Sequence, residues 1–130
     1  DGDGCFQMTC QELITATTEN IPIKIVVFNN GNHGMVRQWQ KIFYNSKFSA
    51  SELGHVVPDY VKLAESMGAV GLRMIKKSEV KNVFSEMLKI NDRPVLIDCV
   101  VDPEDMVFPM VPAGGSNDQI ILNEEDLKNL

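Results

Sequence analysis

The 130-residue sequence has only two histidines and no pattern typical of catalysis by protein side chains. His33 and His55 lack the spacing of a catalytic triad or of a metal cage, and neither a GxSxG nor a Walker sequence is present. We therefore do not expect a protein side chain to supply the nucleophile of a reaction.

Cysteine is scarce as well. The three cysteines, Cys5, Cys10 and Cys99, form neither a CxxC pair nor the spacing of a metal site. An odd number of cysteines without such a pattern favours free thiols in a reducing compartment. We interpret all three as structural.

The sequence also lacks an excess of basic residues and any long apolar run. Its net charge of -6 argues against nonspecific binding to nucleic acid or to an anionic membrane. No run approaches the roughly 18 apolar residues of a membrane span, and no signal-peptide pattern opens the chain. With 44% hydrophobic residues, we expect a soluble protein with an ordinary core.

What the sequence does contain is a pair of polar loops that suit a metal-held diphosphate. Asp3 lies between Gly2 and Gly4, so its carboxylate can bind a divalent cation while the glycines let backbone N–H groups approach a phosphate. Asn29 and Asn30 follow an apolar run and can add an amide oxygen. Mg²⁺ takes such oxygen ligands and shares them with substrate phosphates.

Each loop by itself has a simpler interpretation, because Gly-Asp-Gly is common in turns and Asn-Asn often ends a strand. The spacing between the loops favours the site. The interval has room for one crossover helix and one strand, which would place both loops at the carboxyl ends of adjacent parallel strands. Open α/β sheets bind ligands at that edge.

Helical and apolar segments alternate along the chain, which predicts a doubly wound parallel sheet with helices on both faces. Residues 9–12 have the form of a capping box, and Ser78 can cap a later helix. We expect strands at 23–28, 71–75 and 94–101, and helices at 11–19, 35–44, 58–67, from 78 onward and near 124–130. One domain is expected over residues 1–112, followed by a C-terminal tail over 113–130.

The two loops carry a resemblance to a known family. GDG at 2–4 followed by NN at 29–30 resembles the cofactor motif of thiamine-diphosphate-dependent enzymes. GDGCFQMT at 2–9 and NNGNHGMVRQWQ at 29–40 are similar to the C-terminal thiamine-diphosphate-binding domain of acetolactate synthase catalytic subunits. The resemblance continues through DYVKLA at 59–64 and PMVPAG at 109–114, so it covers nearly the whole chain.

This resemblance implies that two pyruvates, or pyruvate and 2-ketobutyrate, condense with loss of CO₂ in branched-chain amino-acid synthesis. Thiamine diphosphate does the covalent work in the family, which agrees with the lack of a side-chain nucleophile. The family uses three domains in a longer chain, so we expect a fragment that lacks its first strand and is inactive by itself. The alternatives are a sibling decarboxylase, oxidase or carboligase, or a module that only binds cofactor or assembles.

The resemblance also implies the residues of the site. Asp3 and Asn30 would bind Mg²⁺ through their side chains and Asn32 through its backbone carbonyl, where the family often has an acidic residue or Tyr. The residues expected to contact the cofactor are Gly2, Asp3, Gly4, Cys5, Met8, Asn30, Asn32, Gly34 and Met35. Cys5 stands where the family more usually has Ser or Ala, and a buried methionine is the alternative for Met8. No catalytic residue is assigned in this chain.

Met35, Val36 and Trp39 are implied to line the substrate pocket, with the tryptophan shaping the preference for the second keto acid. The spacing of these three residues alone favours core packing, because apolar residues at i, i+3 and i+4 usually form the buried face of a helix. Arg37 is interpreted as a surface or interface cation rather than as a clamp for the substrate carboxylate.

The remaining implications concern partners and location. Small 2-keto acids would be the substrates, and FAD would bind outside this chain. The catalytic subunits would form a homodimer or homotetramer, with a regulatory small subunit as an optional partner. No nucleic-acid or membrane partner is expected, and the protein would be cytoplasmic in a bacterium or organellar in a eukaryote.

Overall fold

A computed structural model describes residues 1–54 and 56–129, and the chain divides into two compact units. The first unit comprises Asp1–Asn32 and Leu53–Pro103, and the second comprises His33–Glu52 and the segment from Glu104 onward. The expected boundary between residues 112 and 113 stays a prediction. None of the helices in the described ranges has the length and apolarity needed to cross a membrane.

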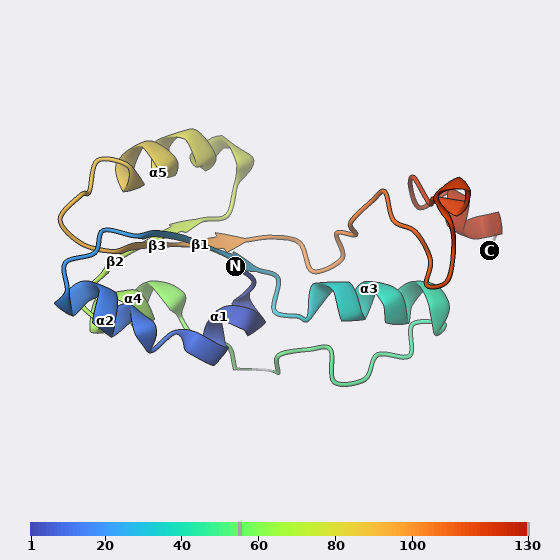
Figure 1. The fold of residues 1–130 in the computed structure, drawn as a ribbon, viewed down its shortest axis with the longest axis horizontal. Coiled ribbons are helices and arrows are strands. Elements are labelled where there is room, and N and C mark those ends of the chain that lie inside the picture. The colour runs from blue at the N-terminus through green and yellow to red at the C-terminus, as the bar shows by residue number, and fades with distance from the viewer. Residues whose placement is uncertain (55, 130) are drawn as a thin grey trace. The chain divides into compact units, whose positions relative to one another are not determined.

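The first unit is built on a parallel sheet of three strands (Figure 1). The strands are β1 (Lys24–Asn29), β2 (Val70–Met74) and β3 (Val95–Val100), in the order β1-β3-β2. The central strand β3 carries the apolar run that follows Pro94, and its first four residues are buried. A central parallel strand is covered on both faces, which explains why this run is continuous rather than alternating.

The first residues of the chain run beside β1. Gly2 forms an isolated parallel bridge with Phe28, and the Phe28 N–H donates to the Asp1 carbonyl oxygen at 2.8 Å. The Asp1 nitrogen in turn donates to the Val26 carbonyl oxygen at 2.8 Å. This pairing places the Gly-Asp-Gly sequence next to the end of β1, as the spacing of the two loops predicts.

Helices cover both faces of the sheet, which confirms the predicted α/β class. Val27 and Leu96 belong to one buried cluster, which includes residues of α1 (Asp3–Thr9), α2 (Glu12–Thr18) and α4 (Tyr60–Ser66). Val95 and Ile97 belong to a second cluster with Met87 of α5 (Val80–Met87). Because successive side chains of a strand point to opposite faces, neighbours on β3 enter different clusters.

The second unit contains α3 (Gly34–Phe43) and two short 3₁₀ helices, η2 (Asn117–Gln119) and η3 (Asp126–Asn129). Gln38 is buried on α3 and binds both backbone groups of Val107: its Oε1 accepts from the N–H at 2.7 Å, and its Nε2 donates to the carbonyl at 3.0 Å. Met110 and Ile121 pair across an antiparallel bridge. A buried amide and one bridge therefore tie the C-terminal segment within this unit.

Three local expectations were wrong. The Gly-Asp-Gly turn is the start of a helix, because the Phe6 N–H donates to the Gly2 carbonyl at 2.8 Å and closes the first turn of α1. The capping box is absent, since the chain is already helical at Gln11 and no side chain caps α2. Ser78 caps nothing, because the 3₁₀ turn η1 (Lys77–Glu79) leads directly into α5.

Candidate functional site

Asp3 joins the two loops that the sequence singled out. Its side chain is buried, at 2% exposure. One carboxylate oxygen accepts a hydrogen bond from the Gly4 N–H at 2.9 Å, and the other accepts from the Gly31 N–H at 2.7 Å. The second bond spans 28 residues and ties the start of α1 to the loop that follows β1.

The surroundings of this carboxylate fit a cation. Within residues 1–54 and 56–129, no Lys, Arg or His forms an ion pair with Asp3. A buried carboxylate without an opposite charge is costly, and the two N–H donors leave each oxygen with a further lone pair. No group of three His, Cys, Asp or Glu side chains in the described ranges suits a metal, so other ligands here would be amide, carbonyl or phosphate oxygens.

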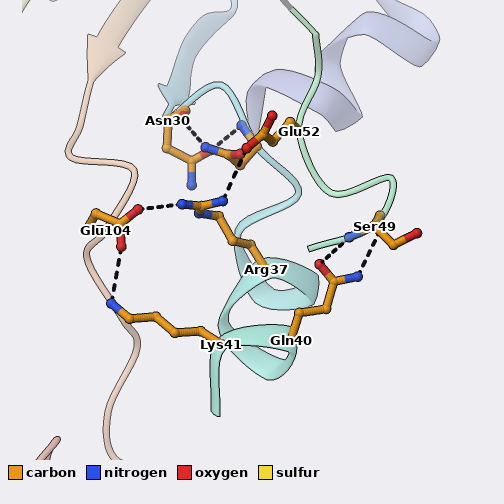
Figure 2. Close-up of polar contacts among 8 residues, drawn as sticks. Asn30, Arg37, Gln40, Lys41, Ser49, Glu52 and Glu104 are labelled. Atoms are coloured by element: carbon orange, nitrogen blue, oxygen red, sulfur yellow. Dashed lines mark hydrogen bonds and ion pairs between the residues drawn. The ribbon is translucent and has the colours of Figure 1, made fainter. Parts of the chain in front are cut away.

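The loop after β1 offers such oxygens. The Asn30 Oδ1 accepts from the Asn32 N–H at 3.0 Å, and the Asn32 Nδ2 donates to the Asn30 carbonyl at 2.7 Å (Figure 2). These two bonds fold the loop onto itself, with Gly31 between them at φ +69°. The Asn30 Oδ1 keeps one lone pair for a further contact.

The other residues of the first unit that were expected at the cofactor lie around α1. Gly2 is extended, at φ -83° and ψ 155°, and a Cβ added there would meet nothing within 4 Å. Neither backbone conformation nor packing within this chain requires glycine at this position, which fits close approach by another molecule. The Cys5 N–H lies in the first turn of α1, where N–H groups lack helical partners. Cys5 is exposed, and Met8 is 71% exposed, so the Met8 side chain does not belong to a core of this chain.

Tyr60 holds the backbone of Asp3 through a hydrogen bond. It is completely buried at the start of α4, and its hydroxyl donates to the Asp3 carbonyl oxygen at 3.2 Å. The Gln7 Nε2 donates to the same hydroxyl at 3.0 Å. Burial raises the pKa of the Tyr60 hydroxyl, although the hydrogen bond from Gln7 acts in the opposite direction. The hydroxyl therefore remains a donor at neutral pH.

A second polar network lies toward the carboxyl ends of the three strands. Asp98 of β3 accepts hydrogen bonds from the Asn29 Nδ2 and from the Arg73 Nε, both at 2.9 Å. Arg73 also donates through Nη2 to Asp59 at 2.7 Å, and Asp59 is the N-cap residue of α4. The hydrogen bond to Asp98 raises the pKa of Arg73.

The residues expected to line a substrate pocket, together with Gly34, lie on α3 in the second unit. Met35 is 51% exposed and Val36 is 50% exposed, so these two side chains do not belong to a core of this chain. Trp39 packs edge to face with Phe43 at 5.2 Å between ring centroids. Trp39 also lines a cavity of about 170 Å³, together with Phe43, Tyr44, Pro112 and Ala113.

Arg37 is engaged by acidic residues of its own unit. It pairs with Glu52 at 3.4 Å and with Glu104, which also binds Lys41 at 3.2 Å (Figure 2). Its guanidinium carbon lies 4.0 Å from the centroid of the Phe48 ring. These contacts show that acidic residues already engage the Arg37 guanidinium, and its interpretation as a surface or interface cation stays a prediction.

Sequence reasoning missed Tyr60, Asp98 and Arg73. Asp98 and Arg73 are single charged residues inside apolar strand sequences, and Tyr60 follows the cap of a helix. A charge in a buried strand is rare unless it is paired, so an isolated Asp within VLIDCV signals a buried polar contact. That signal identifies the residue, but it does not identify the partner.

A parallel α/β domain with a buried carboxylate and an asparagine loop at one sheet edge has the form of a phosphate-cofactor domain. Residues 1–99 match the family model described as thiamine pyrophosphate enzyme, C-terminal TPP binding domain, and the chain belongs to this family. Thiamine pyrophosphate is another name for thiamine diphosphate.

Individual relatives narrow the comparison. Over 123 residues, which are 92% of this chain and 20% of the relative, the chain is 54% identical to a protein named acetolactate synthase from Mycobacterium avium. Over the same shares, it is 52% identical to the acetolactate synthase large subunit of Corynebacterium glutamicum. A solved thiamine diphosphate-dependent 4-hydroxybenzoylformate decarboxylase from Rhodococcus jostii RHA1 is 28% identical with a TM-score of 0.68, over 78% of this chain and 19% of that one. The chain spans about a fifth of the length of the curated relatives that it matches.

Proposed function

We propose that this chain is the diphosphate-binding part of the catalytic subunit of an acetolactate synthase. The full-length protein would condense two pyruvates, or pyruvate and 2-ketobutyrate, with loss of CO₂. The observation that carries the proposal is the 54% identity, over 92% of the chain, to a protein of that name. The sequence GMVRQWQ of α3 is the part of the chain that favours the synthase among related enzymes.

In this proposal the first unit holds Mg²⁺ and the cofactor's diphosphate. Asp3 and Asn30 bind the cation through side-chain oxygens, and Asn32 binds it through its backbone carbonyl. The Asp3 carboxylate is buried and forms no ion pair with the residues that the structure describes, which supports this assignment. Gly2, Gly4 and Cys5 contribute backbone contacts to the diphosphate, which the open space around Gly2 supports. Met8 contacts the cofactor at the margin of the site.

The second unit would shape the substrate pocket. Gly34 and Met35 contact the cofactor, while Met35, Val36 and Trp39 face the 2-keto acid. The exposure of Met35 and Val36 supports this role, because their apolar side chains are available for contact. Thiamine diphosphate, when bound, supplies the carbon nucleophile that attacks the keto group. The chain's own residues bind and orient, and none of them is assigned a proton transfer.

The rest of the active site would lie outside this chain. FAD and the glutamate that activates the cofactor would belong to other domains, with the glutamate supplied by a neighbouring subunit of a homodimer or homotetramer. A regulatory small subunit is a further proposed partner. A bacterial enzyme would be cytoplasmic and a eukaryotic one organellar, and relatives include both bacterial proteins and a mitochondrial one from Aspergillus candidus.

A second candidate function is decarboxylation of a 2-keto acid without the second condensation. It is favoured by the structural similarity to the 4-hydroxybenzoylformate decarboxylase. The 28% identity to that enzyme is lower than the 54% identity to the M. avium synthase, and we therefore place decarboxylation second.

Product identification tests the proposal. The full-length protein is supplied with pyruvate, thiamine diphosphate, Mg²⁺ and FAD, and wild type is compared with Asp3→Ala. Asp1→Ala is the control, because it removes an exposed carboxylate two positions away. We expect acetolactate from wild type and the control, and none from Asp3→Ala. Acetaldehyde or acetate from wild type would instead assign the protein to a sibling enzyme.

A further inference from the structure

Asp98 is a buried residue of the first unit that has no role in the proposed contacts with Mg²⁺, cofactor or substrate. It is 1% exposed in the central strand β3, and it binds neighbours on both sides. Oδ1 accepts from the Asn29 Nδ2 on β1, and Oδ2 accepts from the Arg73 Nε on β2, each at 2.9 Å. Removing one partner of a buried charged hydrogen bond leaves the other unsatisfied, so the three side chains hold one another in place.

Asn29 connects Asp98 to the loop after β1, which carries the candidate metal ligands Asn30 and Asn32. It is the last residue of β1 and directly precedes Asn30. Its side chain is held by Asp98, and its carbonyl oxygen accepts from the Val101 N–H at 3.0 Å. The side-chain amide of Asn29 is thus held by β3 and its carbonyl by the residue that follows β3, which fixes the direction in which the loop leaves the sheet.

The second oxygen of Asp98 leads toward Asp3. Arg73 donates to Asp59 at 2.7 Å, and Asp59 caps the helix that begins with Tyr60. Tyr60 in turn holds the Asp3 carbonyl. Asp98 binds Asn29 through a single hydrogen bond, whereas its connection to Asp3 passes through three further residues. We therefore expect Asp98 to affect the position of Asn29 more strongly than that of Asp3.

We propose that Asp98 is a positioning residue for the Mg²⁺ and diphosphate site, acting through Asn29 on the loop that carries Asn30 and Asn32. This rests on the proposed function, in that the loop binds the cation. Asp98 itself contacts neither cation nor cofactor in this assignment. Hydrogen bonds that orient metal ligands from behind typically contribute about 10- to 100-fold to metal affinity.

Asp98→Ala in the full-length protein tests the proposal. Alanine at position 98 cannot accept from the Asn29 Nδ2 or from the Arg73 Nε, so both hydrogen bonds are lost; asparagine at 98 would keep the first one, because the Asn29 amide can rotate and accept from it. Binding of thiamine diphosphate is measured by calorimetry as a function of Mg²⁺, without substrate. We expect the half-saturating Mg²⁺ concentration to rise about tenfold or more.

A reversed pair separates positioning from stability. In Asn29→Asp combined with Asp98→Asn, the amide at 98 donates to the carboxylate at 29, so that bond is restored with its direction reversed. The same amide still accepts from Arg73, so the second bond keeps its direction. We expect this double variant to recover most of the Mg²⁺ response. Ile97→Val is the control, because it removes a buried methyl group from the opposite face of the same strand. It should lower the melting temperature and leave the Mg²⁺ response unchanged.

Two results would overturn the proposal. One is an unchanged half-saturating Mg²⁺ concentration in Asp98→Ala, whatever happens to its melting temperature. The other is a raised concentration that the reversed pair does not restore, because the effect would then not pass through Asn29. Binding is measured without turnover, so a wild type that binds cofactor but makes no acetolactate would refute the proposed function and leave this inference standing.

Discussion

The Asp3 carboxylate accepts a hydrogen bond from the Gly31 N–H at 2.7 Å, although the two residues are 28 positions apart. This bond joins the first turn of α1 to the loop after β1. It requires Gly31 to hold a left-handed backbone, at φ +69°. The geometry of the candidate metal site therefore depends on one glycine that contributes no side chain to it.

Gly31→Ala should disturb this bond through the backbone alone. A Cβ at position 31 would meet nothing within 4 Å, so no steric clash is expected. A left-handed conformation costs an L-residue about 1–2 kcal/mol, which should lower the melting temperature of the full-length protein and weaken its binding of Mg²⁺. Gly31→Asn is the control and should be milder, since Asn tolerates this region. Equal losses in the two variants would contradict the prediction.

Gly2→Ala should weaken cofactor binding without lowering the melting temperature. Gly2 has an ordinary extended backbone, and the space around its Cβ position is open, so the melting temperature should stay unchanged. If the diphosphate approaches this backbone, the added methyl group should weaken thiamine diphosphate binding severalfold. Calorimetric titration of the full-length variant gives the affinity. Unchanged affinity would remove Gly2 from the cofactor contacts.

Tyr60→Phe should change how stability depends on alkaline pH. Burial raises the pKa of the folded-state hydroxyl above its usual value of about 10. Above pH 10 the unfolded chain therefore loses this proton first, and the stability contribution present below pH 10 is lost as pH rises through the folded-state pKa. The melting temperature of wild type should fall more steeply above pH 10 than that of Tyr60→Phe. Tyr44→Phe, at an exposed tyrosine, should behave like wild type.

At neutral pH the same Tyr60→Phe variant should be less stable than wild type. It loses the bond to the Asp3 carbonyl and the acceptor of the Gln7 amide. A typical hydrogen bond contributes about 0.5–1.5 kcal/mol, so a fall of a few degrees in melting temperature is expected. No loss at pH 7 would mean that water replaces both contacts.

The strands could be predicted from the sequence to within one residue at each end. β1 and β3 are rich in β-branched residues and β2 is a short, mainly apolar run, and each lies next to Pro, Gly or Asn, which is the local pattern of a strand. Helix α1 could not be predicted in this way, because Asp-Gly-Cys is a weak helical sequence. It is stabilised by tertiary packing, since Phe6 is buried against the same cluster as Leu13 and Val27.

The metal-binding candidates and the Asp98 network also differ in how far the sequence predicts them. Asp3 and Asn30 could be selected from local motifs, because residue type and spacing carry the chemistry. The network of Asp98 could not, because its partners depend on strand order and register. Asp98 lies opposite both Val27 and Arg73 only because β3 is inserted between β1 and β2. Nothing local in the sequence specifies that insertion.

Gln38→Leu should loosen the C-terminal segment within the second unit. Leucine has a similar size but cannot bind the N–H and carbonyl of Val107, which Gln38 holds at 2.7 and 3.0 Å. Losing both bonds removes roughly 1–3 kcal/mol of local stability. Hydrogen exchange of the Val107 amide in the full-length protein should therefore accelerate about 5- to 150-fold.

Gln40→Leu is the matched control. Gln40 lies on the same helix as Gln38, and its side-chain amide binds the backbone N–H and carbonyl of Ser49 in the same way. It should accelerate exchange at Ser49 and leave Val107 protected. If Gln38→Leu accelerated both amides equally, the two glutamines would stabilise α3 as a whole rather than separate backbone segments. If each variant accelerated exchange only at its own partner, the Gln38 side chain would stabilise the segment around Val107. The Gln40 side chain would then stabilise the segment around Ser49.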